Sequence, residues 1–155
     1  MQVTLRTWTE AQGWNETGTF KDADLVIYFG GKGILDSGEH YRTLAGFYPG
    51  AHLIGCSTGG EIRNARVFDG SIVAAALRFE KTPLKVFGMP IAGVEESFHA
   101  GKAVAEALRG DGLKHVFLLS DGTNVNGSEL VRGLYSVLDA GITVTGGLAG
   151  DGADF

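Results

Sequence analysis

Short apolar runs that end in glycine-rich or polar segments recur along this chain, and the pattern predicts buried strands followed by loops. The runs cover residues 26–29, 51–55, 116–119 and 142–145, and another strand is predicted near residues 3–6. These runs are too short for the apolar face of a helix. We therefore predict strands at these positions, with loops at their carboxyl ends.

Between the strands, apolar residues recur at the spacing of one helix face. Three helices are predicted, at residues 36–48, 98–108 and 126–138, and they are expected to end at Pro49-Gly50, residues 110–112 and Gly141. Asp36 with Glu39, and Asn126 with Glu129, have the spacing of capping boxes. The inner face of the third helix is predicted to consist of Leu130, Val131, Leu134, Val137 and Leu138.

The middle of the chain departs from this alternation. Residues 61–70 have no helical pattern, and Asp69-Gly70 is typical of a turn. Two β-rich runs follow, at residues 71–79 and 84–91, and we predict that they pair as an antiparallel hairpin through Pro83. The chain is thus predicted to be an α/β protein, with a layered mixed β-sheet, flanking helices and an inserted antiparallel β-hairpin.

We treat residues 1–155 as a single domain. The chain stops five residues after Gly150, where a loop has just left a predicted buried strand. A sheet edge at that point would normally be covered by further chain. We therefore expect the domain to be incomplete at its C-terminal end, or to complete its sheet by pairing with another copy.

Composition narrows the classes of partner. Lys and Arg number 13 against 18 Asp and Glu, so the net charge of −5 provides no excess of positive charge for nucleic acid. The longest apolar run, residues 72–77, is far below the ~20 residues of a membrane span, and no secretion signal is evident. A single cysteine, Cys56, allows no internal disulfide and fits a cytoplasmic protein. Hydrophobic residues make up 44% of the chain, enough for a packed core.

The predicted loops collect glycines and polar side chains at the carboxyl ends of strands, where ligands bind in α/β sheets. Glycine is abundant, at 25 of 155 residues. The candidate ligand-binding residues are Gly55, Cys56, Ser57, Thr58, Gly59, Glu61, Asp121, Asn124, Asn126, Gly146, Gly147 and Asp151. Ser57 and Thr58 would offer hydroxyls, and Asp121, Asn124 and Asp151 would anchor a ligand's polar groups. The alternative is that glycine and asparagine here serve only as turn formers.

Three of these segments resemble the signatures of the FIST N-terminal domain, in the same order and spacing over about residues 20–155. They read LIGCSTGGEI at residues 53–62, SDGTNVNG at 120–127 and TGGLAGDG at 145–152. The resemblance implies an intracellular sensory domain that binds a small polar metabolite, such as an amino acid, and signals to a protein or output domain. It also implies truncation, because the family's C-terminal partner domain is absent from this sequence. We expect the three bends to meet and shape one polar hollow.

Two other functions stay open. Residues 55–59 match the G-x-S-x-G pattern of a hydrolase, with Ser57 as nucleophile, and Cys56 could act as a thiol nucleophile. The hydrolase would need a helix directly after the motif and a histidine within reach, so we predict a binding domain rather than an enzyme. The histidines, His40, His52, His99 and His115, are too scattered for a metal site. One of them could still be the axial ligand of a haem-based gas sensor, although no cofactor is predicted.

Overall fold

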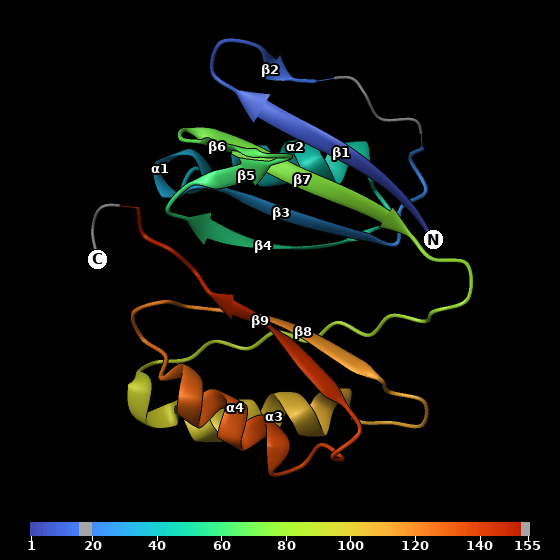
Figure 1. Ribbon diagram of the computed structural model, residues 1–155, viewed down its shortest axis with the longest axis vertical. Helices are drawn as coiled ribbons and strands as arrows, with labels where there is room; N and C mark the ends of the chain where they lie inside the picture. The colour runs from blue at the N-terminus through green and yellow to red at the C-terminus, as the bar shows by residue number, and fades with distance from the viewer. Residues whose placement is uncertain (16–19, 153–155) are drawn as a thin grey trace. The chain divides into compact units, whose positions relative to one another are not determined.

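The computed structural model describes residues 1–15 and 20–152, and its contacts divide the chain into two compact units (Figure 1). Unit 1 contains Met1–Leu84 and the segment that starts at Gly150. Unit 2 contains Lys85–Ala149. That residues 1–155 form a single domain stays a prediction.

A five-stranded mixed sheet forms the framework of unit 1. Its order is β2 (Gly13–Trp14), β1 (Gln2–Thr9), β7 (Ser71–Arg78), β3 (Leu25–Gly31) and β4 (His52–Thr58). Only β3 and β4 are parallel neighbours, and the other pairs are antiparallel. The predicted strands near residues 3–6, 26–29 and 51–55 are confirmed, and so is the mixed α/β fold class.

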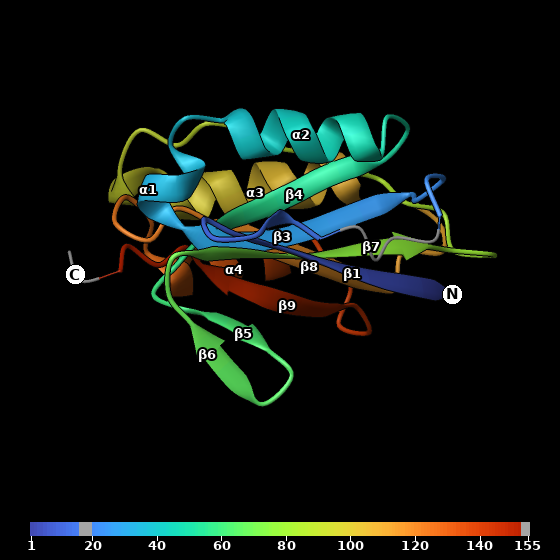
Figure 2. The same ribbon diagram turned by 90° about the horizontal axis from the view of Figure 1, so that it is seen from above.

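Helix α2 (Glu39–Phe47) covers one face of this sheet (Figure 2). Leu44 and Tyr48 of this segment are buried against Val26 of β3 and Ala74 of β7. The predicted capping box is wrong, because Asp36 belongs to the end of a separate short helix, α1 (Lys32–Leu35). Gly38, with φ 66°, is the residue before α2, a backbone conformation that glycine tolerates.

The inserted hairpin is present but lies elsewhere in the sequence. It consists of β5 (Glu61–Arg63) and β6 (Arg66–Phe68). The predicted pairing of residues 71–79 with 84–91 is wrong, because both edges of β7 are occupied by β1 and β3. Residues 84–91 form no strand, and Pro83 and Pro90 lack the amide donors that a ladder requires.

The buried carboxylate of Glu61 ties the hairpin to the sheet. Glu61 is 2% exposed, and its Oε1 accepts a hydrogen bond from Thr58 Oγ1 at 2.8 Å. Its Oε2 accepts from both the backbone N and the Oγ of Ser71, at 3.2 and 2.8 Å. On the same hairpin, Arg63 Nη1 donates to Thr7 Oγ1 of β1 at 3.0 Å. The hairpin is thus held at its base by polar contacts rather than by an apolar core.

Replacing Glu61 with alanine is expected to lower the free energy of unfolding by about 2 kcal/mol, because three donors lose their acceptor in a buried place. Urea denaturation measures the loss. The exposed Glu10 provides the control, and Glu10→Ala should change stability by less than about 0.5 kcal/mol. Equal losses in the two variants would contradict the anchoring role of Glu61.

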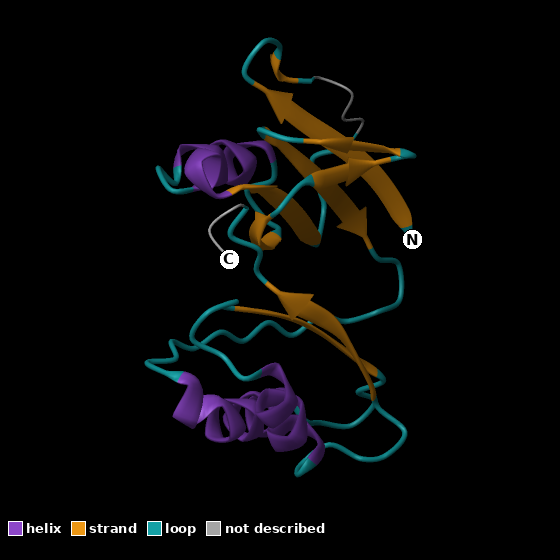
Figure 3. Cartoon of the chain, turned by 60° about the vertical axis from the view of Figure 1, so that its left-hand side comes forward, coloured by secondary structure: helices purple, strands orange, loops and turns teal. Residues whose placement is uncertain are grey.

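Unit 2 pairs two parallel strands with two helices. The strands are β8 (His115–Ser120) and β9 (Thr143–Leu148), and the helices are α3 (Ser97–Leu108) and α4 (Gly127–Tyr135), preceded by a 3-10 turn at Val94–Glu96. Figure 3 shows α3 and α4 on the same face of the strand pair. The core there contains Val104, Ala105, Val116, Leu134 and Leu138.

The predicted elements of unit 2 are confirmed with two corrections. Asn126 is the N-cap of α4, and its side chain accepts a hydrogen bond from Glu129 N at 3.2 Å, as the capping box predicts. The helix ends at Tyr135 rather than near residue 138, although Leu138 is still buried. Val131 does not belong to the inner face, since it is 40% exposed.

Candidate functional site

The first signature forms the second half of β4 rather than a loop. Gly55, Cys56, Ser57 and Thr58 pair with residues 28–31 of β3, so the prediction of a loop over residues 55–61 is wrong for these positions. Only Gly59 and Gly60 bend the chain, and Glu61 opens β5. β4 continues as far as Thr58 because β3 remains alongside it up to Gly31.

Neighbouring side chains of β4 point to opposite faces of the sheet. Thr58 lies on the face that the β5–β6 hairpin covers, because its hydroxyl reaches Glu61. Cys56 shares that face, and Ser57 lies on the other. Burial raises the pKa of the Cys56 thiol, which keeps it protonated and a poor nucleophile at neutral pH. A ligand could therefore meet either Ser57 or the pair Cys56 and Thr58, but not one compact group of all three.

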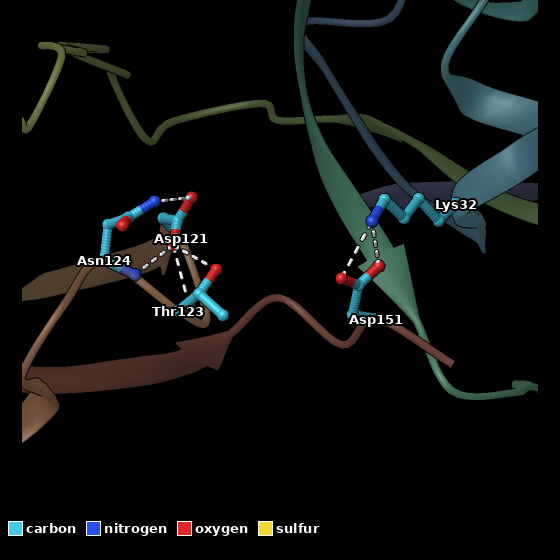
Figure 4. Close-up of polar contacts among 5 residues, drawn as sticks. All are labelled: Lys32, Asp121, Thr123, Asn124 and Asp151. Atoms are coloured by element: carbon cyan, nitrogen blue, oxygen red, sulfur yellow. Dashed lines mark hydrogen bonds and ion pairs between the residues drawn. The ribbon is translucent and has the colours of Figure 1, made fainter. Parts of the chain in front are cut away.

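The end of the third signature lies against the first signature within unit 1. Gly150 N donates to the carbonyl of Ser57 at 2.9 Å. Asp151 then forms an ion pair with Lys32, whose Nζ is 2.6 Å from Oδ1 and 2.8 Å from Oδ2 (Figure 4). The carboxylate predicted to anchor a ligand's amino group is thus paired with an ammonium group of the chain itself.

Glu61, also a predicted ligand residue, faces inward. Both of its oxygens accept the hydrogen bonds from Thr58 and Ser71 described above. A ligand would have to break these contacts to reach the carboxylate. The structure therefore shows a structural role for Glu61, and its role as a ligand contact stays a prediction.

The second signature is a loop, as predicted, and Asp121 organises it. Its Oδ1 accepts from the backbone N of Thr123 at 2.7 Å and of Asn124 at 2.6 Å (Figure 4). The N–H groups of Asn124 and Thr123 lower the pKa of the Asp121 carboxyl, because they stabilise its ionised form. Asp121 and Asn124 are both exposed. Asn126 has an internal task as the cap of α4, and its backbone N donates to Ser97 Oγ at 2.9 Å.

An open pocket of about 670 Å³ lies between the ends of β8 and β9 and the start of α4, entirely within unit 2. It is lined by Leu118, Ser120, Gly127, Ser128, Leu130, Val131, Val144, Thr145, Gly146, Gly147 and Leu148. Its size falls within the range of small-molecule sites. The second and third signatures thus contribute to one pocket, with an apolar lining and hydroxyls from Ser120, Ser128 and Thr145.

The sequence predicted only part of this pocket. Gly146 and Gly147 were predicted as ligand residues and do line it, although they belong to β9 rather than to a loop. Ser120, Ser128 and Thr145 also line it but were not among the predicted ligand residues: Ser120 and Thr145 open the second and third signatures, and Ser128 lies one residue after the second. That all three signatures line one hollow stays a prediction.

A smaller open pocket, of about 250 Å³, lies in unit 1 and includes Asp24 and His52 in its lining. Asp24 Oδ2 accepts a hydrogen bond from Phe79 N at 2.6 Å, so this carboxylate already holds the chain after β7. The pocket contains no residue of the three signatures. It is therefore the weaker candidate for a ligand site.

The G-x-S-x-G motif does not form the turn that a hydrolase requires. Ser57 lies within β4, and a hairpin rather than a helix follows it. In the part of the chain that the structure describes, no three His, Cys, Asp or Glu side chains gather closely enough to hold a metal ion. Within those same residues, no helix has the length and hydrophobicity needed to cross a bilayer.

Comparison with known proteins agrees with the signatures. The model of the FIST N domain, a sensory domain of signal transduction, matches residues 24–155. No curated protein and no solved structure matched the chain. Because the match extends over most of the sequence, this chain belongs to the FIST N domain family.

Proposed function

We propose that this domain senses a small metabolite with a polar head and an apolar body, such as an amino acid, in the pocket of unit 2. The observation that supports the proposal most directly is that residues of the second and third signatures line a pocket of suitable size. The family membership supports a sensory role in signal transduction.

The pocket offers different chemistry to the two parts of such a ligand. Leu118, Leu130 and Val144 supply apolar surface for a side chain. Gly127 and Ser128 form the first turn of α4, where backbone N–H groups lack acceptors within the helix and attract an anionic group such as a carboxylate. Ser120, Ser128 and Thr145 add hydroxyls that can donate or accept.

Asp121 is the proposed partner of a ligand's amino group. It directly follows the pocket residue Ser120, and its exposed carboxylate is held ionised by the loop amides. Oδ1 is used by the loop, whereas Oδ2 is 3.5 Å from Asn124 Nδ2, a weak contact that an ammonium group could replace. Ligand binding would then order the loop, and that ordering would pass to a cytoplasmic signalling protein or output domain.

A thermal-shift screen of free amino acids tests the proposal. A ligand at about 100 times its dissociation constant should stabilise the protein by about 2.7 kcal/mol. Val131→Phe, which fills the pocket, should remove this shift. Val94 is also an exposed valine of unit 2, at 51%, but lies outside the pocket lining, so Val94→Phe should retain it.

Two outcomes would count against the proposal. A cooperative melt that no amino acid moves would contradict amino-acid sensing, and a shift that survives Val131→Phe would place the ligand elsewhere. Haem is included in the screen as a separate arm. A strong visible absorption band after haem addition, lost on replacement of one histidine, would favour the gas-sensor alternative instead.

A further inference from the structure

The first signature, residues 53–62, contributes no residue to the lining of the pocket in unit 2. Sensing in that pocket therefore leaves the motif without a task. The third signature is divided between the two units. Its residues 145–148 line the pocket, whereas Gly150 and Asp151 belong to unit 1. The chain thus passes from the wall of the pocket to the first signature within a few residues.

Two successive backbone amides mark this passage. Ala149 N donates to Ser120 O of β8 at 2.8 Å, within unit 2. Gly150 N donates to Ser57 O of β4 at 2.9 Å, within unit 1. β4 is the last strand of its sheet and pairs with β3 along one edge, so Gly150 bonds to the other edge. The chain that leaves β9 is therefore held by β8 at one residue and by β4 at the next.

Gly150 lies directly against the backbone of the first signature. A Cβ at this position would be 2.8 Å from Gly59 N and 3.1 Å from the carbonyl carbon of Thr58. Real Cβ atoms essentially never approach backbone atoms so closely, and neither neighbour is a flexible side chain that could move aside. Glycine is therefore required here, since any other residue would force the segment away from β4.

The ion pair between Lys32 and Asp151 holds the same segment from the neighbouring strand. Lys32 directly follows Gly31, which pairs in register with Thr58 of β4. Its Nζ reaches both carboxylate oxygens of Asp151, at 2.6 and 2.8 Å (Figure 4). The Asp151 side chain is 25% exposed, so solvent screens this pair less than it screens a fully exposed one.

The pocket residue nearest to these contacts in the sequence is Leu148, the last residue of β9. Its side chain lies beside Gly127 at the start of α4, where a Cβ would be 3.7 Å from each Cδ atom of Leu148. Gly150 follows two residues later, so at most ~7 Å of extended chain separates them. The end of a strand opens readily unless the chain beyond it is held. The position of Gly150 therefore limits where Leu148 can lie.

We propose that Lys32 and residues 57–59 form a clamp on Gly150 and Asp151, and that this clamp fixes the pocket-lining end of β9. The first signature would then set the affinity of a pocket that it does not line. Its residues act as positioning residues rather than as ligand contacts. The effect on affinity rests on the function proposed above, whereas the effect on β9 does not.

The clamp also gives ligand binding a route into unit 1. When the clamp opens, Leu148 can leave the wall of the pocket, and a ligand that packs on Leu148 binds the closed state better. Such a ligand shifts the chain toward the closed clamp, and by linkage the closed clamp raises the affinity for the ligand. A bound metabolite should therefore slow hydrogen exchange of the Gly150 amide as well as fill the pocket.

Hydrogen exchange of the full chain without ligand tests the clamp itself. Asp151→Asn leaves the amides of Ala149 and Gly150 in place and should speed their exchange about two- to fivefold, as expected for the loss of one partly exposed ion pair. Gly150→Ala should speed exchange of the Ala149 amide, which lies in unit 2, at least about tenfold. Asp151→Glu retains the carboxylate and should keep most of the protection.

Unit 1 offers a matched control for each variant. Asp22 forms an ion pair with Arg78, 2.9 Å between Oδ2 and Nη1, and Asp22→Asn should leave exchange at Ala149 unchanged. Gly50 has no atom within 4 Å of its would-be Cβ, so Gly50→Ala should also leave it unchanged. Circular dichroism of each variant confirms that it is folded, and Asp151→Asn tests the clamp even if Gly150→Ala does not fold.

Calorimetric titration with the metabolite found in the thermal-shift screen tests the effect on the pocket. Gly150→Ala should lower the affinity at least about tenfold, and Gly50→Ala should not change it. Clamp variants that exchange like the wild-type chain would overturn the proposal whether or not a ligand is found. Faster exchange at Ala149 with unchanged affinity would overturn the clamp's effect on the pocket and leave sensing intact. A chain that binds no amino acid contradicts the sensing function, and the exchange rates then decide the clamp alone.

Discussion

Replacing Gly101 with alanine is expected to lower the free energy of unfolding by about 3 kcal/mol, measured by thermal or urea denaturation. Gly101 of α3 lies against α4, and a Cβ at this position would overlap the backbone carbonyl of Leu130. Gly133 of α4 has the reciprocal contact, because its Cβ would overlap the carbonyl of Phe98 in α3. The two helices therefore touch backbone to backbone, and either methyl group would force them apart.

Gly46 provides the matched control for this prediction. It is also a helical glycine, in α2, but it is exposed and a Cβ there would meet no atom within 4 Å. Gly46→Ala should raise stability by about 0.5–1 kcal/mol, because alanine favours the helix more than glycine does. Gly133→Ala should behave like Gly101→Ala. If both α3 and α4 variants were as stable as Gly46→Ala, the close packing of the two helices would be contradicted.

The elements that the sequence predicted well are those set by local signals. Asn126 caps α4 through a contact three residues away, and the run at residues 116–119 is a strand in a core that its own apolar side chains help to form. The predicted hairpin at residues 71–91 was wrong because the strands that pair with β7 lie far from it in the sequence. β7 is apolar enough to be a strand, but β1, some 70 residues earlier, and β3 occupy both of its edges.

The real hairpin was not predictable from hydrophobic pattern. β5 and β6 have three residues each, and their side chains include Arg63 and Arg66. What holds them is the buried Glu61, a residue type that usually lies at the surface. The acceptor role of Glu61 becomes visible only when Ser71 and Thr58 are brought beside it.

The sequence predicted that residues of the second and third signatures would contribute to a candidate site, but it did not predict the roles of the individual side chains. A polar residue in a glycine-rich loop can hold a ligand or hold the loop itself, and sequence alone does not distinguish these tasks. Asp121 and Asn126 were predicted to contact a ligand, yet both satisfy nearby backbone N–H groups. Ser128 and Thr145 line the pocket because α4 and β9 place them there, which depends on the packing of unit 2.

The two glycines of the third signature that line the pocket are expected to respond differently to substitution by alanine: one substitution should affect the fold and the other the binding of the ligand. Gly146 has φ 148°, a conformation that side chains rarely adopt, and a Cβ there would overlap the carbonyl of Leu118 on β8. Gly146→Ala should therefore lower the free energy of unfolding by about 3 kcal/mol or more. The overlap would first weaken the parallel pairing of β8 with β9.

Gly147 is the next residue of β9 but has no such constraint. A Cβ at this position would meet no atom within 4 Å, so Gly147→Ala should change stability by less than about 0.5 kcal/mol. Its methyl group would occupy part of the pocket, and the affinity for the sensed metabolite should fall about tenfold. Thermal denaturation compares the stability of Gly146→Ala with that of Gly147→Ala. Calorimetric titration of Gly147→Ala with the ligand found in the screen measures the affinity. If Gly147→Ala bound the ligand as well as the wild-type chain, Gly147 would not be a ligand contact, and the signature glycines would serve the fold alone.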